Sequence, residues 1–109
     1  MLLNQHNYPK IKFAPREEFD RLSALRRRYE EQLQYFPKGS LSRKIRGNRE
    51  YLYLAHREGS RVIFEYIGNS DSDEARKVIK DVEERKSVER KLKEVKLELK
   101  QLERLLNRF

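Results

Sequence analysis

The sequence contains no cysteine, no tryptophan, three prolines and four glycines. The absence of cysteine excludes disulfides, thiolate metal sites and a cysteine nucleophile, and it fits a reducing compartment. No run of residues is long and apolar enough to span a membrane. The first residues, Met1–His6, contain no apolar stretch of the length a signal peptide needs. Together these absences predict a cytoplasmic protein that does not contact membranes.

Patterns typical of catalysis or metal binding are also scarce. Histidine occurs only as His6 and His56, and no pair of histidines has the helical spacing that metal sites use. No serine lies in a nucleophile-elbow motif, and the glycines mark turns and helix ends. Carboxylates alternate with cations, as in the ion-pair spacing of Glu89 and Lys93. The sequence therefore predicts that the protein is not an enzyme and that it binds no cofactor, metal or small-molecule substrate.

Positive charge is what the sequence has in excess. The 109 residues include 26 Lys and Arg against 18 Asp and Glu, which gives a net charge of +8. A field of that sign attracts phosphate-bearing polymers and acidic surfaces. The length suits one domain with a thin core. Charged residues make up 40% of the chain, a balance that favours extended helices over a compact globule.

Residues 16–36 are predicted to form a helix that follows an N-terminal arm, residues 1–15. Within the arm, Lys10–Phe13 either adds a short edge strand or is disordered. Pro15 suits the first turn of the helix and Pro37 ends it. Steps of three and four residues define one apolar stripe, made of Phe19, Leu22, Leu25, Tyr29, Leu33 and Phe36.

Residues 40–68 are predicted to form a three-stranded antiparallel meander, which makes the fold class α+β. Gly47-Asn48 and Glu58-Gly59 carry the glycine of short hairpin turns. The strands between these turns are rich in tyrosine, isoleucine and valine. They are Leu41–Arg46, Arg49–His56 and Arg61–Ile67.

A two-residue first turn determines which side chains share a face of this sheet. It places Lys44 opposite Tyr51. One face then carries Lys44, Arg46, Tyr51 and Tyr53, and the other carries Leu41, Ile45, Leu52 and Leu54, which suit a core.

The second turn leaves two alternatives for Phe64 and Tyr66. A two-residue loop, Glu58-Gly59, places them with the tyrosines, whereas a three-residue loop that includes Arg57 places them with the leucines. Aromatic residues in strands pack more often than they bind ligands. We therefore expect Phe64 and Tyr66 to belong to the core.

Residues 71–109 are predicted to form one long helix. Asp71 and Glu74 have the spacing of a capping box. Ala75, Val78 and Val82 begin an apolar stripe whose phase is broken at Arg85 and Lys86. A heptad seam follows, with alternating steps of four and three, at Val88, Leu92, Val95, Leu99, Leu102, Leu106 and Phe109.

Three heptads are marginal alone, so this seam needs a partner helix. The helix at 16–36 has a compatible stripe but is too short to cover the whole seam. We expect Leu99, Leu102, Leu106 and Phe109 to be left bare and to pack against a second copy as a homodimer. In the alternative, the first helix and the arm cover the seam in a monomer, with Phe13 and Phe19 as apolar cover.

The distribution of charge indicates where a polyanion would bind. Residues 16–36 hold five basic and five acidic side chains, whereas residues 38–68 hold seven basic and three acidic ones. Cations mixed with aromatics on an open sheet are typical of nucleic-acid-binding surfaces. The candidate binding residues are Lys38, Arg43, Lys44, Arg46, Arg49, Tyr51, Tyr53, Arg57 and Arg61. The rival hypothesis is a protein-interaction adaptor whose binding surface is the C-terminal seam. The sequence leaves DNA and RNA as equal alternatives.

Part of the chain resembles a family of short uncharacterised prokaryotic proteins. The resemblance lies in a basic glycine-bounded strand, a tyrosine-rich strand, an Arg-Glu-Gly turn and a Tyr-Ile-Gly ending, here Gly39–Gly47, Tyr51–Leu54, Arg57–Gly59 and Tyr66–Gly68. A lysine- and glutamate-rich helix follows, so the resemblance covers residues 36–109 and leaves the first helix outside. Members of that family are encoded near nucleotidyltransferase-like or mobile-element genes, so the resemblance implies a toxin–antitoxin, defence or mobile-element setting. The sheet is also similar to the N-terminal hairpin region of some transposases, and neither resemblance implies an established activity.

Overall fold

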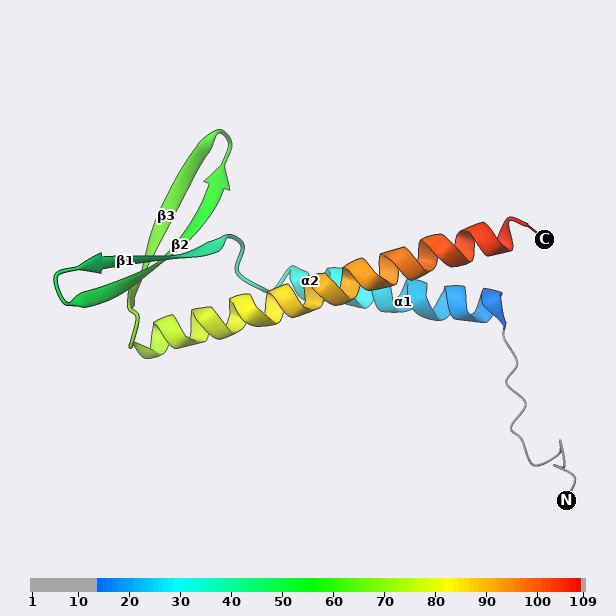
Figure 1. Cartoon of the computed structure of the whole chain (residues 1–109), viewed down its shortest axis with the longest axis horizontal. Coiled ribbons are helices and arrows are strands. Elements are labelled where there is room, and N and C mark those ends of the chain that lie inside the picture. The colour runs from blue at the N-terminus through cyan, green and yellow to red at the C-terminus, as the bar shows by residue number, and fades with distance from the viewer. Residues whose placement is uncertain (1–13, 109) are drawn as a thin grey trace, which may run out of the picture.

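The computed structural model describes residues 14–108 and has the predicted α+β order (Figure 1). Its elements are α1 (Pro15–Leu33), β1 (Ser40–Arg46), β2 (Arg49–Glu58), β3 (Arg61–Asn69) and α2 (Asp73–Leu106). Residues 1–13, which include most of the predicted arm, lie outside the described residues, as does Phe109. The helices form a long hairpin, and the sheet lies at the end of α2 that is remote from the C-terminus.

The first helix begins at Pro15, one residue before the predicted start, because proline is tolerated in the first turn. It ends at Leu33, three residues before the predicted end at Phe36. Pro37 disfavours the helical conformation in the residue before it, so the chain leaves the helix through a turn at residues 34–36. This turn exposes Tyr35 almost completely.

The N-terminus of α2 is capped by Ser72 and not by the predicted Asp71. The Ser72 hydroxyl accepts a hydrogen bond from the backbone N–H of Ala75 at 3.2 Å. The N–H of Asp71 instead donates to the side-chain oxygen of Asn69 at 3.1 Å. The helix then continues for 34 residues, or about 51 Å at the usual rise. No helix within residues 14–108 is long and apolar enough to cross a membrane.

The sheet is an antiparallel meander in the order β1-β2-β3. Arg46 pairs with Arg49, so Gly47-Asn48 is the predicted two-residue turn. The second turn also has two residues, but they are Gly59-Ser60, one position later than predicted. The glycine opens each turn with a φ of +62°, as the twist of tight hairpins favours.

The face of the sheet that carries Leu52 and Leu54 is turned toward α2. Strands β1 and β3 contact this helix, and Leu52, Leu54, Ala75 and Val82 are all buried. The predicted core face is therefore correct for its central leucines. Ile45, which was predicted to share this core, is exposed near the β1–β2 turn, because the tip of that hairpin extends beyond α2 (Figure 1).

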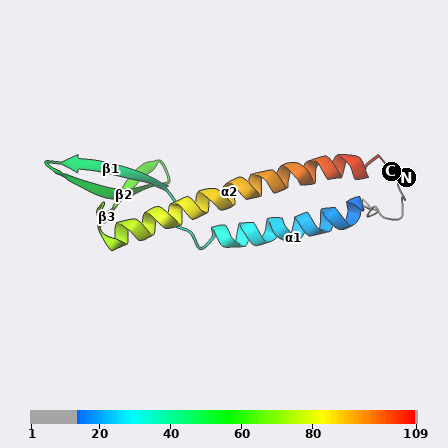
Figure 2. The same ribbon diagram turned by 60° about the horizontal axis from the view of Figure 1, so that its bottom comes forward.

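The two helices pack along their apolar stripes, and α1 runs antiparallel beside the C-terminal half of α2 (Figure 2). Leu22, Val95 and Leu99 form the buried centre, with Phe19, Leu25, Tyr29 and Leu102 packed against it. The expectation that Leu99 would be bare is wrong, since only 6% of it is exposed. Leu102 and Leu106 are half-buried. The expectation failed because the sheet covers the N-terminal half of α2, which leaves α1 to cover the seam. A homodimer stays a prediction, but the bare seam no longer supports it.

Arg85 marks the point where the two halves of α2 change partners. Its Nη1 atom donates to the backbone oxygens of Pro37 at 2.6 Å and Gly39 at 2.7 Å, and its Nε atom donates to Glu89 at 2.8 Å. Only 16% of the Arg85 side chain is exposed. The phase break in the apolar stripe therefore has a structural role: a guanidinium at this position holds the linker between α1 and β1 against α2.

Candidate nucleic-acid interface

The face of the sheet turned away from α2 carries four aromatic rings and a lysine. Tyr51 and Tyr53 come from β2, Phe64 and Tyr66 from β3, and Lys44 from β1. Tyr66 is 59% exposed and Phe64 is 48% exposed. The expectation that these two residues belong to the core is therefore wrong. The turn at Gly59-Ser60 preserves the alternation that places them with the tyrosines.

The rings form an aromatic row on this open face, in which Tyr66 contacts both tyrosines of β2 and Lys44 lies between Tyr53 and Phe64. The centroid of Tyr66 lies 5.4 Å from that of Tyr53 and 6.2 Å from that of Tyr51, with ring planes tilted by 60° and 52°. The Lys44 ammonium lies 4.8 Å from the Tyr53 centroid and 4.4 Å from the Phe64 centroid. A cation at these distances interacts favourably with the electron-rich ring faces. The face thus combines a positive charge with flat apolar surfaces.

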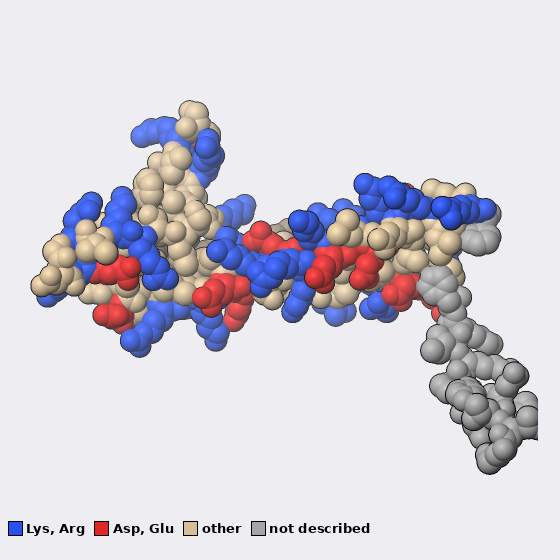
Figure 3. Space-filling view, in the orientation of Figure 1, with Lys and Arg blue, Asp and Glu red and all other residues tan. Residues whose placement is uncertain are grey.

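The β1–β2 turn adds arginines on the same face. Arg46 and Arg49 occupy paired positions on either side of the turn, and both are exposed. Like charges directly opposite each other destabilise a hairpin. In Figure 3, Lys and Arg side chains gather at the tips of both hairpins, and the sheet between them is mostly uncharged. An anion bound between Arg46 and Arg49 would relieve their repulsion.

The other end of the open face borders a hollow of about 470 Å³. Lys38 and Arg57 contribute cations to its lining, together with Gly39, Ser40, Ala55, His56 and Val62. Gly39 has a φ of +106°, and a β-carbon there would lie 2.4 Å from the Ala55 oxygen. Glycine is therefore required where the linker meets β2. This close contact brings Lys38 near the end of the aromatic face.

Two of the predicted binding residues lie on the opposite face. Arg43 pairs with Leu52 in the register, and its guanidinium is 3.9 Å from Glu50. Arg61 pairs with Glu58, which alternation also places on the α2 side of the sheet. The open face therefore gathers Lys44, Arg46, Arg49, Tyr51, Tyr53 and Arg57, with Lys38 beside it, and does not include Arg43 or Arg61.

The remaining polar groups offer little catalytic chemistry within the described residues. His56 Nε2 lies 3.3 Å from Glu65 Oε1 on the α2 side of the sheet. No group of His, Asp and Glu side chains among residues 14–108 could hold a metal ion. Two carboxyl groups of α1 have lowered pKa values. Hydrogen bonds from Arg21 and Arg26 lower the pKa of Glu18 and Glu30, respectively.

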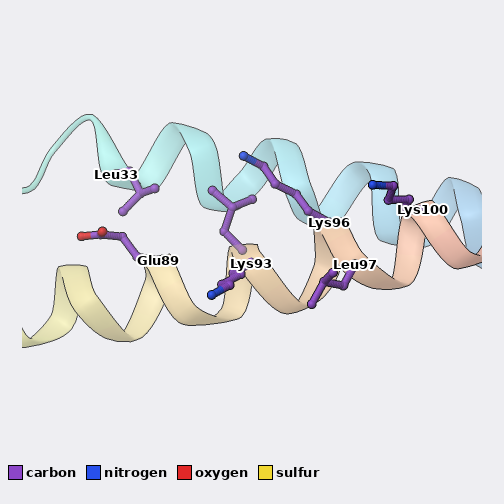
Figure 4. A pocket seen from close by; sticks show the side chains of 7 residues that line it. Leu33, Glu89, Lys93, Lys96, Leu97 and Lys100 are labelled. Atoms are coloured by element: carbon purple, nitrogen blue, oxygen red, sulfur yellow. The ribbon is translucent and has the colours of Figure 1, made fainter.

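The sequence prediction missed two features of the surface. The first is the Arg85 contact with the linker, for which the interrupted apolar stripe was the available signal. The second is a hollow of about 480 Å³ between the helices, lined by Leu33, Glu89, Leu92, Lys93, Lys96, Leu97 and Lys100 (Figure 4). Its signal was Leu97, an apolar residue that lies off the heptad seam.

Comparison with protein families gives one match. A family model described as "Domain of unknown function (DUF6788)" matches residues 16–77. The match includes α1, the whole sheet and the first residues of α2, so it covers the helix that the earlier resemblance left outside. No curated protein and no solved structure gives a significant match to the chain.

Proposed function

We propose that this chain, which belongs to the family described as "Domain of unknown function (DUF6788)", binds single-stranded nucleic acid on the open face of its sheet. The observation that supports the proposal most strongly is the aromatic row, in which Phe64 and Tyr66 are exposed beside the half-buried Tyr51 and Tyr53, with Lys44 among the rings. Monomeric proteins seldom expose such an apolar surface without a binding role.

A single strand fits this face better than a duplex because its bases are free to leave their stack. Each base presents a flat surface that can stack on a tyrosine or phenylalanine ring, and such stacking is tolerant of sequence. Bases in a duplex are already stacked on one another. Lys44 covers ring faces of Tyr53 and Phe64. In this proposal its ammonium moves to a phosphate and leaves the rings to the bases.

The arginines at the β1–β2 turn and the cations beside the hollow extend this face at both ends. Arg46 and Arg49 would bind phosphates at one end, and Lys38 and Arg57 at the other. A strand crossing β2 between them would pass over the aromatic row. Each phosphate contact on a single strand contributes about 0.7 to the slope of log affinity against log salt concentration.

Paired variants on the two faces of the same strands test the electrostatic part of the proposal. Arg46→Gln with Arg49→Gln should weaken binding to a fluorescent single-stranded oligonucleotide and flatten the salt slope by about 1.4 if both contacts are lost. Arg43→Gln with Arg61→Gln removes the same charge from the opposite face and should leave the slope unchanged. Equal effects from the two pairs would indicate nonspecific attraction to the net charge, contrary to the proposal.

An aromatic variant with a matched control tests the stacking part. Tyr66→Leu should weaken binding by about 5- to 150-fold, because a stacked base contributes roughly 1–3 kcal/mol. Tyr35→Leu replaces an even more exposed tyrosine outside the sheet and should have no effect. Both titrations are followed by fluorescence anisotropy with single-stranded and duplex probes. Tighter binding of the duplex would contradict a stacking face.

We also propose a biological setting, a location and an assembly state for this chain. The toxin–antitoxin, defence or mobile-element setting rests on the sequence resemblance alone. A cytoplasmic location rests on the absence of cysteine, and a role without catalysis rests on the lack of a catalytic pattern. A homodimer would present two open faces to one strand and strengthen weak binding through effective concentration. The rival adaptor hypothesis used the C-terminal seam, which α1 occupies in this chain.

A further inference from the structure

A second basic surface lies on α2, away from the sheet. Positions separated by alternating steps of four and three carry five cations and one leucine, and all are exposed: Lys86, Arg90, Lys93, Leu97, Lys100 and Arg104. We call this set the basic stripe. Within residues 14–108, none of its five cations forms an ion pair, although Arg85 and Glu89 beside it do.

Neighbouring cations of the basic stripe repel one another, although carboxylates such as Glu89, four residues before Lys93, lie within reach of some of them. Lys86 and Arg90 are four residues apart, as are Lys100 and Arg104, and Arg90 and Lys93 are three apart. Like charges at these spacings destabilise a helix. The seam that packs on α1 lies in a different phase of the helix, so packing within the chain does not explain the charges. An acidic partner would neutralise them.

Leu97 interrupts the stripe with an apolar group that is 54% exposed. It lies at the hollow of about 480 Å³, where Leu33 points from α1 toward α2 and Lys93, Lys96 and Lys100 lie around the apolar lining (Figure 4). The one acidic residue of the lining, Glu89, is paired with Arg85. A hollow with leucines inside and lysines around it suits an apolar side chain on an acidic segment.

We infer that the basic stripe and the hollow at Leu97 bind an acidic amphipathic helix of another protein. The partner helix would carry Glu or Asp in heptad phase, opposite the five cations, and one central apolar residue that enters the hollow. This is helix-in-groove recognition, in which an apolar anchor supplies affinity and the surrounding charges set orientation. The inference does not depend on nucleic-acid binding by the sheet.

Charge complementarity argues against the other occupants. Residues 1–13 contain Lys10 and Lys12 and no acidic residue, so the stripe would repel them. A second copy has a net charge of +8, and neither described helix presents an acidic stripe of similar length. A nucleic-acid backbone would pair with the lysines but would gain nothing from the apolar hollow. An acidic helix satisfies both parts of the surface.

A charge-swap experiment on the full chain tests the inference. The probe is a labelled synthetic helical peptide with glutamates in heptad phase around one leucine. A control peptide of the same design has lysines in place of the glutamates. We expect the unmodified protein to bind the acidic peptide and not the basic one. The double variant Lys93→Glu with Lys100→Glu should bind the acidic peptide at least about tenfold more weakly than the unmodified protein does. It should also acquire binding to the basic peptide. A gain of binding cannot result from unfolding.

The matched control is Lys77→Glu with Lys91→Glu, which changes the net charge equally at exposed positions of α2 outside the stripe. This variant should bind the acidic peptide as tightly as the unmodified protein does. Leu97→Ser should weaken acidic-peptide binding at least about tenfold, because a buried anchor carries much of the affinity. The inference is overturned if the unmodified protein does not bind the acidic peptide near physiological salt, if control and stripe variants lose it equally, or if an oligonucleotide displaces it through the same residues.

Discussion

Replacing Arg85 by methionine should destabilise the protein far more than its position on a charged helix suggests. The guanidinium donates to the Pro37 and Gly39 oxygens at 2.6 and 2.7 Å, and its side chain is largely buried. A hydrogen bond from a charged group contributes about 1.5–3 kcal/mol. Methionine keeps the apolar stem but loses both bonds, so we expect the free energy of unfolding to fall by about 3 kcal/mol.

This change is large enough to measure by thermal and urea unfolding. With a typical unfolding entropy per residue, a loss of about 3 kcal/mol lowers Tm by roughly 13 °C in a chain of 109 residues. Arg90→Met is the matched control, because Arg90 is an exposed arginine of the same helix. It should change stability by less than about 0.5 kcal/mol. If the two variants behave alike, Arg85 does not hold the linker against α2.

Three further predictions concern the core, the seam and pH. In urea unfolding, Leu52→Ala should lower the free energy of unfolding by about 2–5 kcal/mol, whereas Val62→Ala on the open face should lower it little. A larger loss for Val62→Ala would mean that the buried and open faces of the sheet have been assigned the wrong way round. Leu99→Glu should unfold the helical hairpin, which circular dichroism would show as a loss of helix. If the variant instead stays folded and sedimentation equilibrium gives half the mass of the unmodified protein, the seam is a dimer interface. Hydrogen bonds from arginines hold the pKa of Glu18 and Glu30 below the unfolded value, so each pair stabilises the fold above the unfolded carboxyl pKa and loses this contribution as pH falls through the lowered folded pKa. The effect is small because both side chains are exposed, and Glu18→Gln with Glu30→Gln should flatten the acid side of the stability–pH curve.

Much of the fold follows from periodicity in the sequence. Steps of three and four residues predict both helices, and glycine at Gly47 and Gly59 predicts both hairpins. The length of the second turn could not be fixed, because a two-residue loop, Glu58-Gly59, and a three-residue loop that includes Arg57 both supply a glycine. Pairing along the whole strand selects a two-residue turn, Gly59-Ser60. That uncertainty concealed the exposure of Phe64, since a change of one residue in the length of the loop exchanges the faces of β3.

The relative placement of elements was harder to predict. The seam of α2 was expected to be partly bare because length alone does not show which half of the helix each neighbour covers. The sheet covers Ala75 and Val82, and α1 covers Val95 and Leu99. The candidate site followed from alternation within strands, which placed Lys44, Arg46, Tyr51 and Tyr53 together as predicted. Arg43 was grouped with Lys44 and Arg46 because they are close in sequence. Successive residues of a strand point to opposite faces, so Arg43 lies on the other face.

Chemical-shift mapping of the full chain with a short single-stranded oligonucleotide tests the proposed function most directly. The account predicts that the largest changes occur at Lys44, Tyr53, Phe64 and Tyr66, with smaller changes at Arg46 and Arg49 and none at Arg43. The aromatic protons of Tyr66 should shift upfield, as a stacked base requires. Changes confined to the cations of α2, or spread evenly over all exposed lysines and arginines without an aromatic shift, would contradict nucleic-acid binding by the open face of the sheet.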